Sequence, residues 1–321
     1  MKRHWIAGAA ALLISAPLAA QTAKMPRIGW LAPDRVFPGP GALEELRRIG
    51  WVDGKNVAID YRYADGSTAK LPELAADLVR QKVDVIITFS AGVLAAKRAT
   101  EGSTIPVVMA TSADPVRIGV ASSLARPGGN VTGITYLTDQ LAGKRLQYVK
   151  EAIPSLKRVA VIWEPAHLDN EMKGIQAASA LLGVQVQSVE VPRPARPNEV
   201  ELAVRAAVHG KAEAIILAPG GFTISQRKEL ISEAAKHRLP AFSAWSIFAE
   251  DGAVLTYGPN PVEMSRRLAY YVDRILKGAK PDSMPIEQPS QFELVVNLNA
   301  AKALGMAFPP RLAQRAEWVI E

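Results

Sequence analysis

Apolar residues in the first half of the chain occur as short runs separated by segments with helical spacing. Runs rich in β-branched residues predict strands at residues 27–31, 57–63, 83–89, 106–110 and 131–136. Between them, apolar side chains at helical spacing predict helices at residues 68–81 and 92–100. Strands that alternate with helices are typical of a parallel sheet covered by helices. The first half is therefore predicted to form an α/β lobe.

The same pattern is repeated in the second half. It predicts strands at residues 158–163, 185–191, 214–218 and 241–243, and helices at residues 140–152, 170–182, 198–209 and 225–237. Residues 124–138, between the two series, contain a Pro-Gly-Gly-Asn turn and one strand, so we interpret them as a hinge crossing. A mature length of about 300 residues also suits two domains of ordinary size. The sequence thus predicts two α/β lobes.

The first twenty residues have the features of a cleaved signal peptide. Lys2 and Arg3 supply a positive start, residues 5–14 form an apolar run, and Ala20 ends a small-residue cleavage site. The alternative is a membrane anchor, but the run is too short to span a bilayer of about 30 Å, and Pro17 would break its helix. Because the chain has no cysteine, lipid attachment through an N-terminal Cys is excluded. We expect residues 1–20 to be removed and the mature protein to work in the periplasm.

Composition and charge narrow the class of partner. Hydrophobic residues make up 49% and charged residues 21% of the 321 residues, which is typical of a globular chain. The net charge is +7, but Lys and Arg are interspersed with Asp and Glu, and no basic stripe with interleaved aromatics occurs. We therefore expect no nucleic-acid partner.

Candidate binding residues lie at the carboxyl ends of the predicted strands, where open parallel sheets bind their ligands. In the first lobe these residues are Asp34, Phe89, Ser90, Ala91, Gly92, Thr111 and Ser112. In the second lobe they are Trp163, Glu164, Gly220, Phe222 and Trp245. Hydroxyls and free N–H groups suit a carboxylate, aromatic faces suit a ring-bearing or apolar body, and acidic side chains suit an ammonium.

Several candidates have a second interpretation. A large ring at a strand end packs into a core as readily as it faces a cleft, so Trp245 and Phe222 are consistent with both roles. Glu164 is also consistent with a helix-capping carboxylate. Tyr257 is a further candidate for the ligand, and its position before Gly258-Pro259, near a lobe crossing, suits a role in the hinge equally.

Motifs of catalytic chemistry are missing from the sequence. It contains no G-x-S-x-G elbow, no G-x-x-x-x-G-K-[ST] phosphate loop, no H-E-x-x-H pair and no cysteine nucleophile. His167, in the loop after the strand at residues 158–163, is a weak candidate for ligand contact. We therefore expect a binding protein and not an enzyme, with no catalytic residue, no metal and no cofactor.

One long stretch carries a resemblance to a known family. Residues 112–133, SADPVRIGVASSLARPGGNVTG, resemble the signature stretch of the ABC-transporter substrate-binding proteins related to the tryptophan/tyrosine uptake component. Separated segments support the resemblance, at residues 50–57, 158–165, 255–259, 271–281 and 287–305. The similarity covers almost the whole mature chain.

The resemblance implies a type I periplasmic binding protein fold, in which two doubly wound parallel-sheet lobes are joined by a hinge of several crossings. Lobe 1 is expected to contain residues 25–134 and 258–286, and lobe 2 residues 135–257 and 287–321. Such a protein captures a small-molecule ligand and delivers it to an ABC permease in the inner membrane. We expect this one to be a monomer. The carried-over roles place a polar end of the ligand at Ser90, Ala91, Gly92, Thr111 and Ser112, and the second-lobe wall at Trp163, Glu164, Phe222 and Trp245.

Two departures from the family pattern leave the ligand open. The loop at residues 33–40 is proline-rich, and the segment at residues 243–246 lacks the charged residue that many relatives carry after the tryptophan. An amino acid and an aromatic carboxylate both suit the candidate site. Two other function classes stay open, namely a periplasmic ligand sensor for a receptor kinase and an enzyme on the same scaffold.

Overall fold

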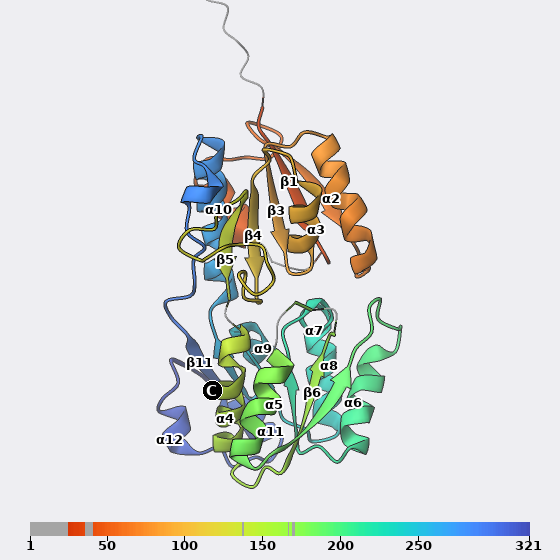
Figure 1. Ribbon diagram of the computed structural model, residues 1–321. Coiled ribbons are helices and arrows are strands. Elements are labelled where there is room, and N and C mark those ends of the chain that lie inside the picture. The colour runs from red at the N-terminus through yellow and green to blue at the C-terminus, as the bar shows by residue number, and fades with distance from the viewer. Residues whose placement is uncertain (1–24, 36–40, 137, 166, 169–170) are drawn as a thin grey trace, which may run out of the picture.

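In the computed structural model, residues 25–35, 41–136, 138–165, 167–168 and 171–321 are described, and they form two α/β lobes (Figure 1). The expected signal peptide, residues 1–20, lies outside these residues. In lobe 1 the sheet order is β2-β1-β3-β4-β5, and every pairing is parallel. Its strands are β1 (Arg27–Ala32), β2 (Ala58–Tyr63), β3 (Val85–Phe89), β4 (Val107–Thr111) and β5 (Val131–Thr135). The five strands predicted for this half are confirmed.

Helices cover both faces of the first sheet, and three of its strands are buried along their whole length. All residues of β3, β4 and β5 are buried. The covering helices are α1 (Gly41–Arg48), α2 (Leu71–Arg80, after the 3₁₀ turn η1, Thr68–Lys70), α3 (Gly92–Ala99) and α10 (Pro261–Leu276). Helix α10 comes from far along the chain and packs beside α1, which the sequence pattern did not predict.

The second sheet has the order β12-β11-β10-β9-β8-β6-β7. Its strands are β6 (Arg158–Trp163), β7 (Gln185–Glu190), β8 (Ala214–Leu217), β9 (Ala241–Ser243), β10 (Leu255–Gly258), β11 (Glu293–Asn297) and β12 (Trp318–Ile320). The pairing of β10 with β11 is antiparallel, and the other pairings are parallel. The sequence pattern predicted none of β10, β11 and β12, and β11 runs antiparallel because the chain reaches it from lobe 1 and not over a crossover helix of its own lobe.

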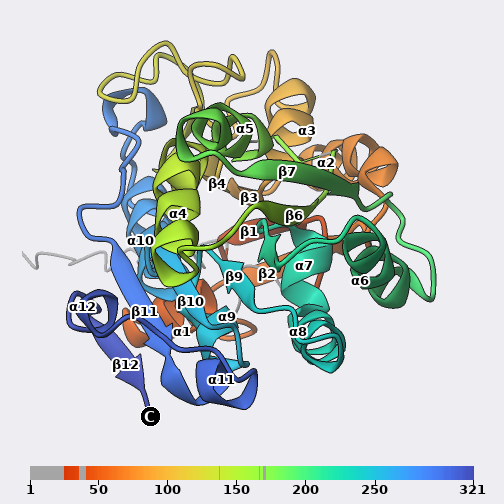
Figure 2. The same cartoon turned by 90° about the horizontal axis from the view of Figure 1, so that it is seen from below.

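The helices of lobe 2 lie on both faces of its sheet. Figure 2 shows α4 and α5 on one face and α6 and α8 on the other. The lobe-2 helices are α4 (Thr138–Ala152), α5 (Glu171–Leu182), α6 (Glu199–His209), α7 (Gly221–Ser225), α8 (Arg227–Lys236), α9 (Ser246–Glu250), α11 (Leu298–Ala303) and α12 (Pro310–Ala313). The helix predicted at residues 225–237 is confirmed as α8, and the short helix α7 before it, separated from it by the non-helical Gln226, was not predicted.

The chain, as far as the structure describes it, passes between the lobes three times on one side (Figure 1). The passages follow β5, β10 and the 3₁₀ turn η2 (Pro281–Ser283). Two of them are tied together, since Glu287 forms a bridge with Ile134 and its carbonyl accepts the N–H of Thr135 at 2.9 Å. No helix among the described residues has the length and apolar character needed to cross a membrane.

Candidate functional site

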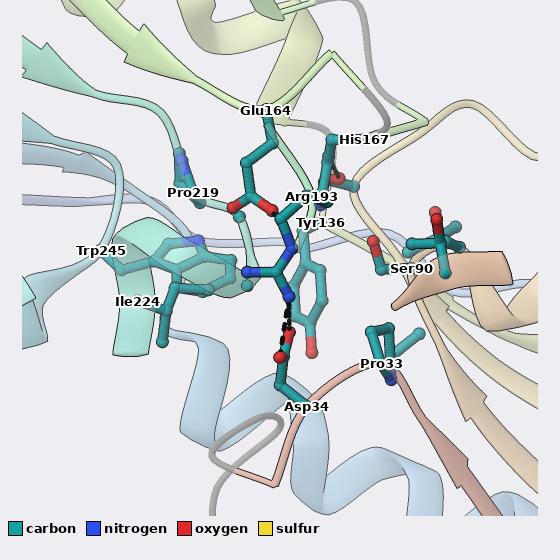
Figure 3. A pocket seen from close by; sticks show the side chains of 17 residues that line it. Pro33, Asp34, Ser90, Tyr136, Glu164, His167, Arg193, Pro219, Ile224 and Trp245 are labelled. Atoms are coloured by element: carbon teal, nitrogen blue, oxygen red, sulfur yellow. Dashed lines mark hydrogen bonds and ion pairs between the residues drawn. The ribbon is translucent and has the colours of Figure 1, made fainter. Parts of the chain in front are cut away.

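A cavity lies between the two lobes, at the carboxyl ends of strands from both sheets. Its volume is about 640 Å³, including solvent at its mouth. Figure 3 shows side chains from both lobes converging on it. The lining residues are Pro33, Asp34, Thr68, Ser90, Ala91, Ala110, Thr111, Ser112, Tyr136, Glu164, His167, Arg193, Pro219, Gly220, Gly221, Ile224 and Trp245.

Ser90 occupies the tight turn between β3 and α3. Its φ of 49° lies in the left-handed region, which costs a residue other than glycine conformational energy. Two backbone hydrogen bonds hold the turn, from the Ser90 N–H to the Ala110 carbonyl and from the Val93 N–H to the Ser90 carbonyl. The strained turn thus places the Ser90 hydroxyl on the cavity wall beside the first turn of α3.

The end of β4 supplies two more hydroxyls. Thr111 Oγ1 accepts a hydrogen bond from the Ala113 N–H at 3.1 Å, which fixes its rotamer. Ser112 Oγ lies 3.4 Å from His167 Nδ1 of lobe 2. Nearby, the Arg117 guanidinium donates to the Leu168 carbonyl at 2.8 Å. The lobes therefore touch along this edge of the cavity.

Arg193 also joins the two lobes. It follows β7, and its Nη2 lies 2.8 and 2.9 Å from the two carboxylate oxygens of Asp34, which follows β1 (Figure 3). Its Nε lies 3.3 Å from Oε2 of Glu164, which follows β6. Only 8% of the Arg193 side chain is exposed. A guanidinium is thus enclosed by carboxylates from both lobes.

The close approach of these charged groups requires Gly220 and Gly221. A Cβ on Gly220 would lie 2.3 Å from Glu164 Oε1, and one on Gly221 would lie 2.1 Å from Asp34 Oδ2. Both distances are far below van der Waals contact, and the second neighbour belongs to the other lobe. The glycine pair therefore admits both carboxylates to the cavity wall.

Glu164 is buried, with 6% of its surface exposed. Its Oε1 accepts the N–H of Phe222, at the start of α7, at 2.7 Å. Burial raises the pKa of this carboxyl above its usual range, and the Arg193 guanidinium opposes the shift. Glu164 consequently holds a proton more readily than an exposed glutamate does.

Two rings form the apolar part of the wall. Tyr136 follows β5 and Trp245 follows β9, and their centroids lie 5.7 Å apart at an angle of 58°. Both residues are buried and both line the cavity, so Trp245 combines the two roles that its sequence position allowed. Burial raises the pKa of Tyr136, which keeps its phenol neutral.

Eight of the residues predicted from the sequence line this cavity. They are Asp34, Ser90, Ala91, Thr111, Ser112, Glu164, Gly220 and Trp245. The structure brings them together because the carboxyl ends of both parallel sheets face the same space between the lobes. His167, the weak candidate, also lines it.

Three of the predicted residues of β3, α3 and α7 do not line it. Phe89 is fully buried and packs against Trp30 at 5.2 Å, because the last side chain of β3 points into the lobe-1 core. Gly92 lies against Thr88, whose Oγ1 would be 2.4 Å from a Cβ. Phe222 is buried in the core, and its backbone N–H instead positions Glu164.

Two predicted aromatics also lie away from the cavity. Trp163 donates its indole N–H to Ser188 Oγ at 2.8 Å, along the neighbouring strand β7. Tyr257 packs against Tyr148 at 4.8 Å and Phe292 at 6.2 Å, beside the lobe crossing. The hinge location that its sequence position allowed is therefore where the ring lies.

Arg193 and Tyr136 are lining residues that sequence reasoning missed. Arg193 follows the strand predicted at residues 185–191, and Tyr136 is the last residue of the one predicted at 131–136, so the strand-end rule could have found them. The first lies in a proline-rich loop that resembles a surface turn, and the second lies in the segment interpreted as a hinge. Nothing local indicates that Arg193 pairs with an aspartate 159 positions away.

Comparison with known proteins agrees with the fold. A curated relative, "Tyrosine-binding protein" of Clostridioides difficile, is 26% identical over 270 residues, which are 83% of this chain and 76% of the relative. A solved conserved domain protein from Vibrio cholerae has 26% identity and a TM-score of 0.80 over 92% of this chain and 100% of that one. An ABC domain from Streptococcus pneumoniae, solved in complex with L-Trp, has 22% identity and a TM-score of 0.77 over 92% and 99%.

These likenesses identify the architecture as the type I periplasmic binding protein fold. Residues 38–320, which are most of the chain, match the model of the family described as "ABC transporter substrate binding protein". The chain belongs to the family of ABC transporter substrate-binding proteins.

Proposed function

We propose that this protein captures an organic solute with a carboxylate and a ring or apolar body between its lobes, and delivers it to the permease of an ABC importer. It would do so in the periplasm, as a monomer, after removal of residues 1–20. The observation that carries the proposal is that the two lobes contribute nearly equal numbers of residues to the cavity wall. A ligand held by both lobes favours their closed arrangement, and a permease can recognise that arrangement.

The lobe-1 side of the cavity supports the carboxylate. Ser90 and Ala91 lie at the start of α3, where helix N–H groups point outward, and the hydroxyls of Thr111 and Ser112 lie beside them. Hydrogen-bond donors without a compensating negative charge are the usual environment for an anionic group. The tyrosine-binding relative and the L-Trp complex favour a solute of the amino acid or aromatic carboxylate class.

The opposite side supports the ring. Trp245 and Tyr136 meet at an angle and offer aromatic faces to the cavity, and Ile224 lies beside them (Figure 3). Such a wall binds planar groups through apolar burial and ring contacts.

The lobe boundaries that we propose follow the three crossings. Lobe 1 contains residues 25–134 and 258–286, and lobe 2 contains residues 135–257 and 287–321. The linked crossings near Thr135 and Glu287 would act as one hinge, because they share backbone hydrogen bonds. Closure about this hinge narrows the cavity.

The test is a calorimetric titration of the chain from Gln21 onward with aromatic amino acids and aromatic carboxylates, combined with small-angle scattering. Binding should lower the radius of gyration, and Ser90→Ala should weaken binding about ten- to a hundredfold, because it removes a hydrogen bond to a charged group. Ser123→Ala is the matched control, since that hydroxyl lies in an exposed loop and donates to the Arg126 carbonyl. Equal affinities of all three proteins, or an unchanged radius of gyration, would contradict the proposal. Uptake by cells with and without the gene tests delivery.

A further inference from the structure

Arg193 has hydrogen-bonding capacity that its neighbours do not use. A guanidinium carries five N–H donors. Nη2 donates to Asp34 and Nε faces Glu164, whereas Nη1 has no acceptor among the residues that the structure describes. Only 8% of the surface of this side chain is exposed, and the side chain lines the cavity. Because the side chain lines the cavity and Nη1 has a free donor there, this edge of the guanidinium is suited to an acceptor of the ligand.

The acidic groups of the cavity are already occupied by Arg193. Both oxygens of Asp34 accept from Nη2, and the two oxygens of Glu164 face the Phe222 N–H and the Arg193 Nε. An ammonium group of a ligand needs a carboxylate with uncompensated charge. Within the described part of the cavity wall, Asp34 and Glu164 are the acidic side chains, and the same guanidinium contacts each of them. One guanidinium compensates one of these two carboxylates, and burial raises the pKa of Glu164, which lessens the negative charge of the other. An ammonium placed beside them would therefore find little uncompensated negative charge and would lie close to a positive one.

The arrangement is built into the wall from both lobes. Gly220 and Gly221 leave space for the carboxylates that a Cβ would occupy, and Gly66 approaches the guanidinium, since its Cβ would lie 3.0 Å from Arg193 Nη2. Three glycines thus bring the backbone close to the charged groups. This enclosure distinguishes the cluster from an exposed ion pair, which contributes little to stability.

We infer that the solute carries a carboxylate but no ammonium group, and that Arg193 is the residue that determines this specificity. The inference rests on the proposed function and narrows its ligand class to aromatic carboxylic acids without an amino group. Arg193 supplies the positive charge that the ammonium of an amino acid would bring, and its Nη1 adds a donor for the ligand to those at the start of α3. In this respect the chain differs from the relatives whose names specify tyrosine or L-Trp.

The experiment compares acids that differ only in the amino group. The chain from Gln21 onward is titrated with 3-phenylpropionate and L-phenylalanine, with 3-(4-hydroxyphenyl)propionate and L-tyrosine, and with 3-(indol-3-yl)propionate and L-tryptophan. In at least one pair the acid without the amino group should bind about tenfold or more tightly, as expected for one uncompensated charged contact. This comparison needs no variant, so it does not depend on a substitution that impairs folding.

The variant Arg193→Gln then tests the residue. It removes the charge between the two carboxylates, so the acid should bind about tenfold more weakly while the amino acid of the same pair gains affinity. Arg196→Gln is the matched control, because Arg196 lies on the same loop, is 58% exposed and pairs with Glu199 outside this cavity. Its titrations should match those of the unsubstituted chain. A parallel loss of both ligands in Arg193→Gln would overturn the assignment of specificity.

Failure of the inference can be told from failure of the proposed function. If the amino acids bind as tightly as the deaminated acids or more tightly, the inference is overturned and solute capture stands. If a folded protein binds neither member of any pair, the inference and the proposed ligand class are both overturned.

Discussion

The ion pair between Asp34 and Arg193 links the lobes, so its removal should shift their closure equilibrium. Asp34→Asn keeps the side-chain volume and one acceptor oxygen but removes the negative charge. The substitution weakens the two contacts of 2.8 and 2.9 Å between Arg193 Nη2 and the Asp34 carboxylate. The side chains of Asp34 and Arg193 are 17% and 8% exposed. Because the partners belong to different lobes, the loss falls on the contact between lobes and not on the core of either one.

The size of the effect follows from the kind of bond. A hydrogen bond to a charged group contributes about 1.5–3 kcal/mol, and about 1.4 kcal/mol is a factor of ten in an equilibrium constant. Asp34→Asn should therefore lower the ratio of closed to open molecules by about ten- to a hundredfold. Melting temperature should change less than the closure equilibrium, because each lobe keeps its own packing.

The assay is a distance measurement between two spin labels. The chain has no cysteine, so labels can be attached to Lys70→Cys in lobe 1 and Glu201→Cys in lobe 2, both at exposed positions away from the crossings. Asp65→Asn is the matched control, because the Asp65 carboxylate pairs with Arg35 within lobe 1 and is 52% exposed. We expect a longer mean distance in Asp34→Asn and an unchanged one in Asp65→Asn. Identical distance distributions for Asp34→Asn and the unsubstituted chain would refute the reasoning.

Three further changes have defined outcomes. Trp245→Ala removes a ring that is 4% exposed, so it should cost about 3–5 kcal/mol of folding free energy in thermal melts and also weaken binding of aromatic acids; intact affinity would show that the ring does not contact the ligand. Gly221→Ala should open the lobes in scattering, because its Cβ would lie 2.1 Å from an oxygen of Asp34, whereas Gly129→Ala, with no atom within 4 Å, should not; an effect of similar size in both would rule out this cause. Burial raises the pKa of Glu164, so the native state keeps its proton to higher pH than the unfolded chain, and this carboxyl lowers stability as the pH rises above its ordinary value of 4.5. Between pH 4.5 and neutral pH, the melting temperature of Glu164→Gln should therefore fall less than that of the unsubstituted chain. Equal decreases in melting temperature would contradict the raised pKa of Glu164.

The alternation of strands and helices could be predicted because it is local information. A run of β-branched residues followed by helical spacing determines the element type, and the strand-end rule then indicates where a ligand binds. This reasoning reached Ser90, Thr111 and Glu164, which the structure places on the cavity wall.

The directions of individual side chains could not be predicted in the same way. Phe89 and Trp163 lie at strand ends as expected, but the ring of Phe89 packs into the lobe-1 core and that of Trp163 lies along β7. A shift of one residue along a strand moves a side chain from one face of the sheet to the other, so an uncertainty of that size at a strand end decides between core and cavity.

By itself, the sequence determined the two α/β lobes and the hydroxyl-rich strand ends, because both depend on neighbours along the chain. The tertiary structure alone decided that β11 runs antiparallel to β10, that the Gly220-Gly221 turn admits two carboxylates, and that Arg193 meets Asp34 across the lobes. These features depend on groups brought together from positions as far as 159 residues apart. Their energies arise from charge, distance and packing in three dimensions, which no local pattern encodes.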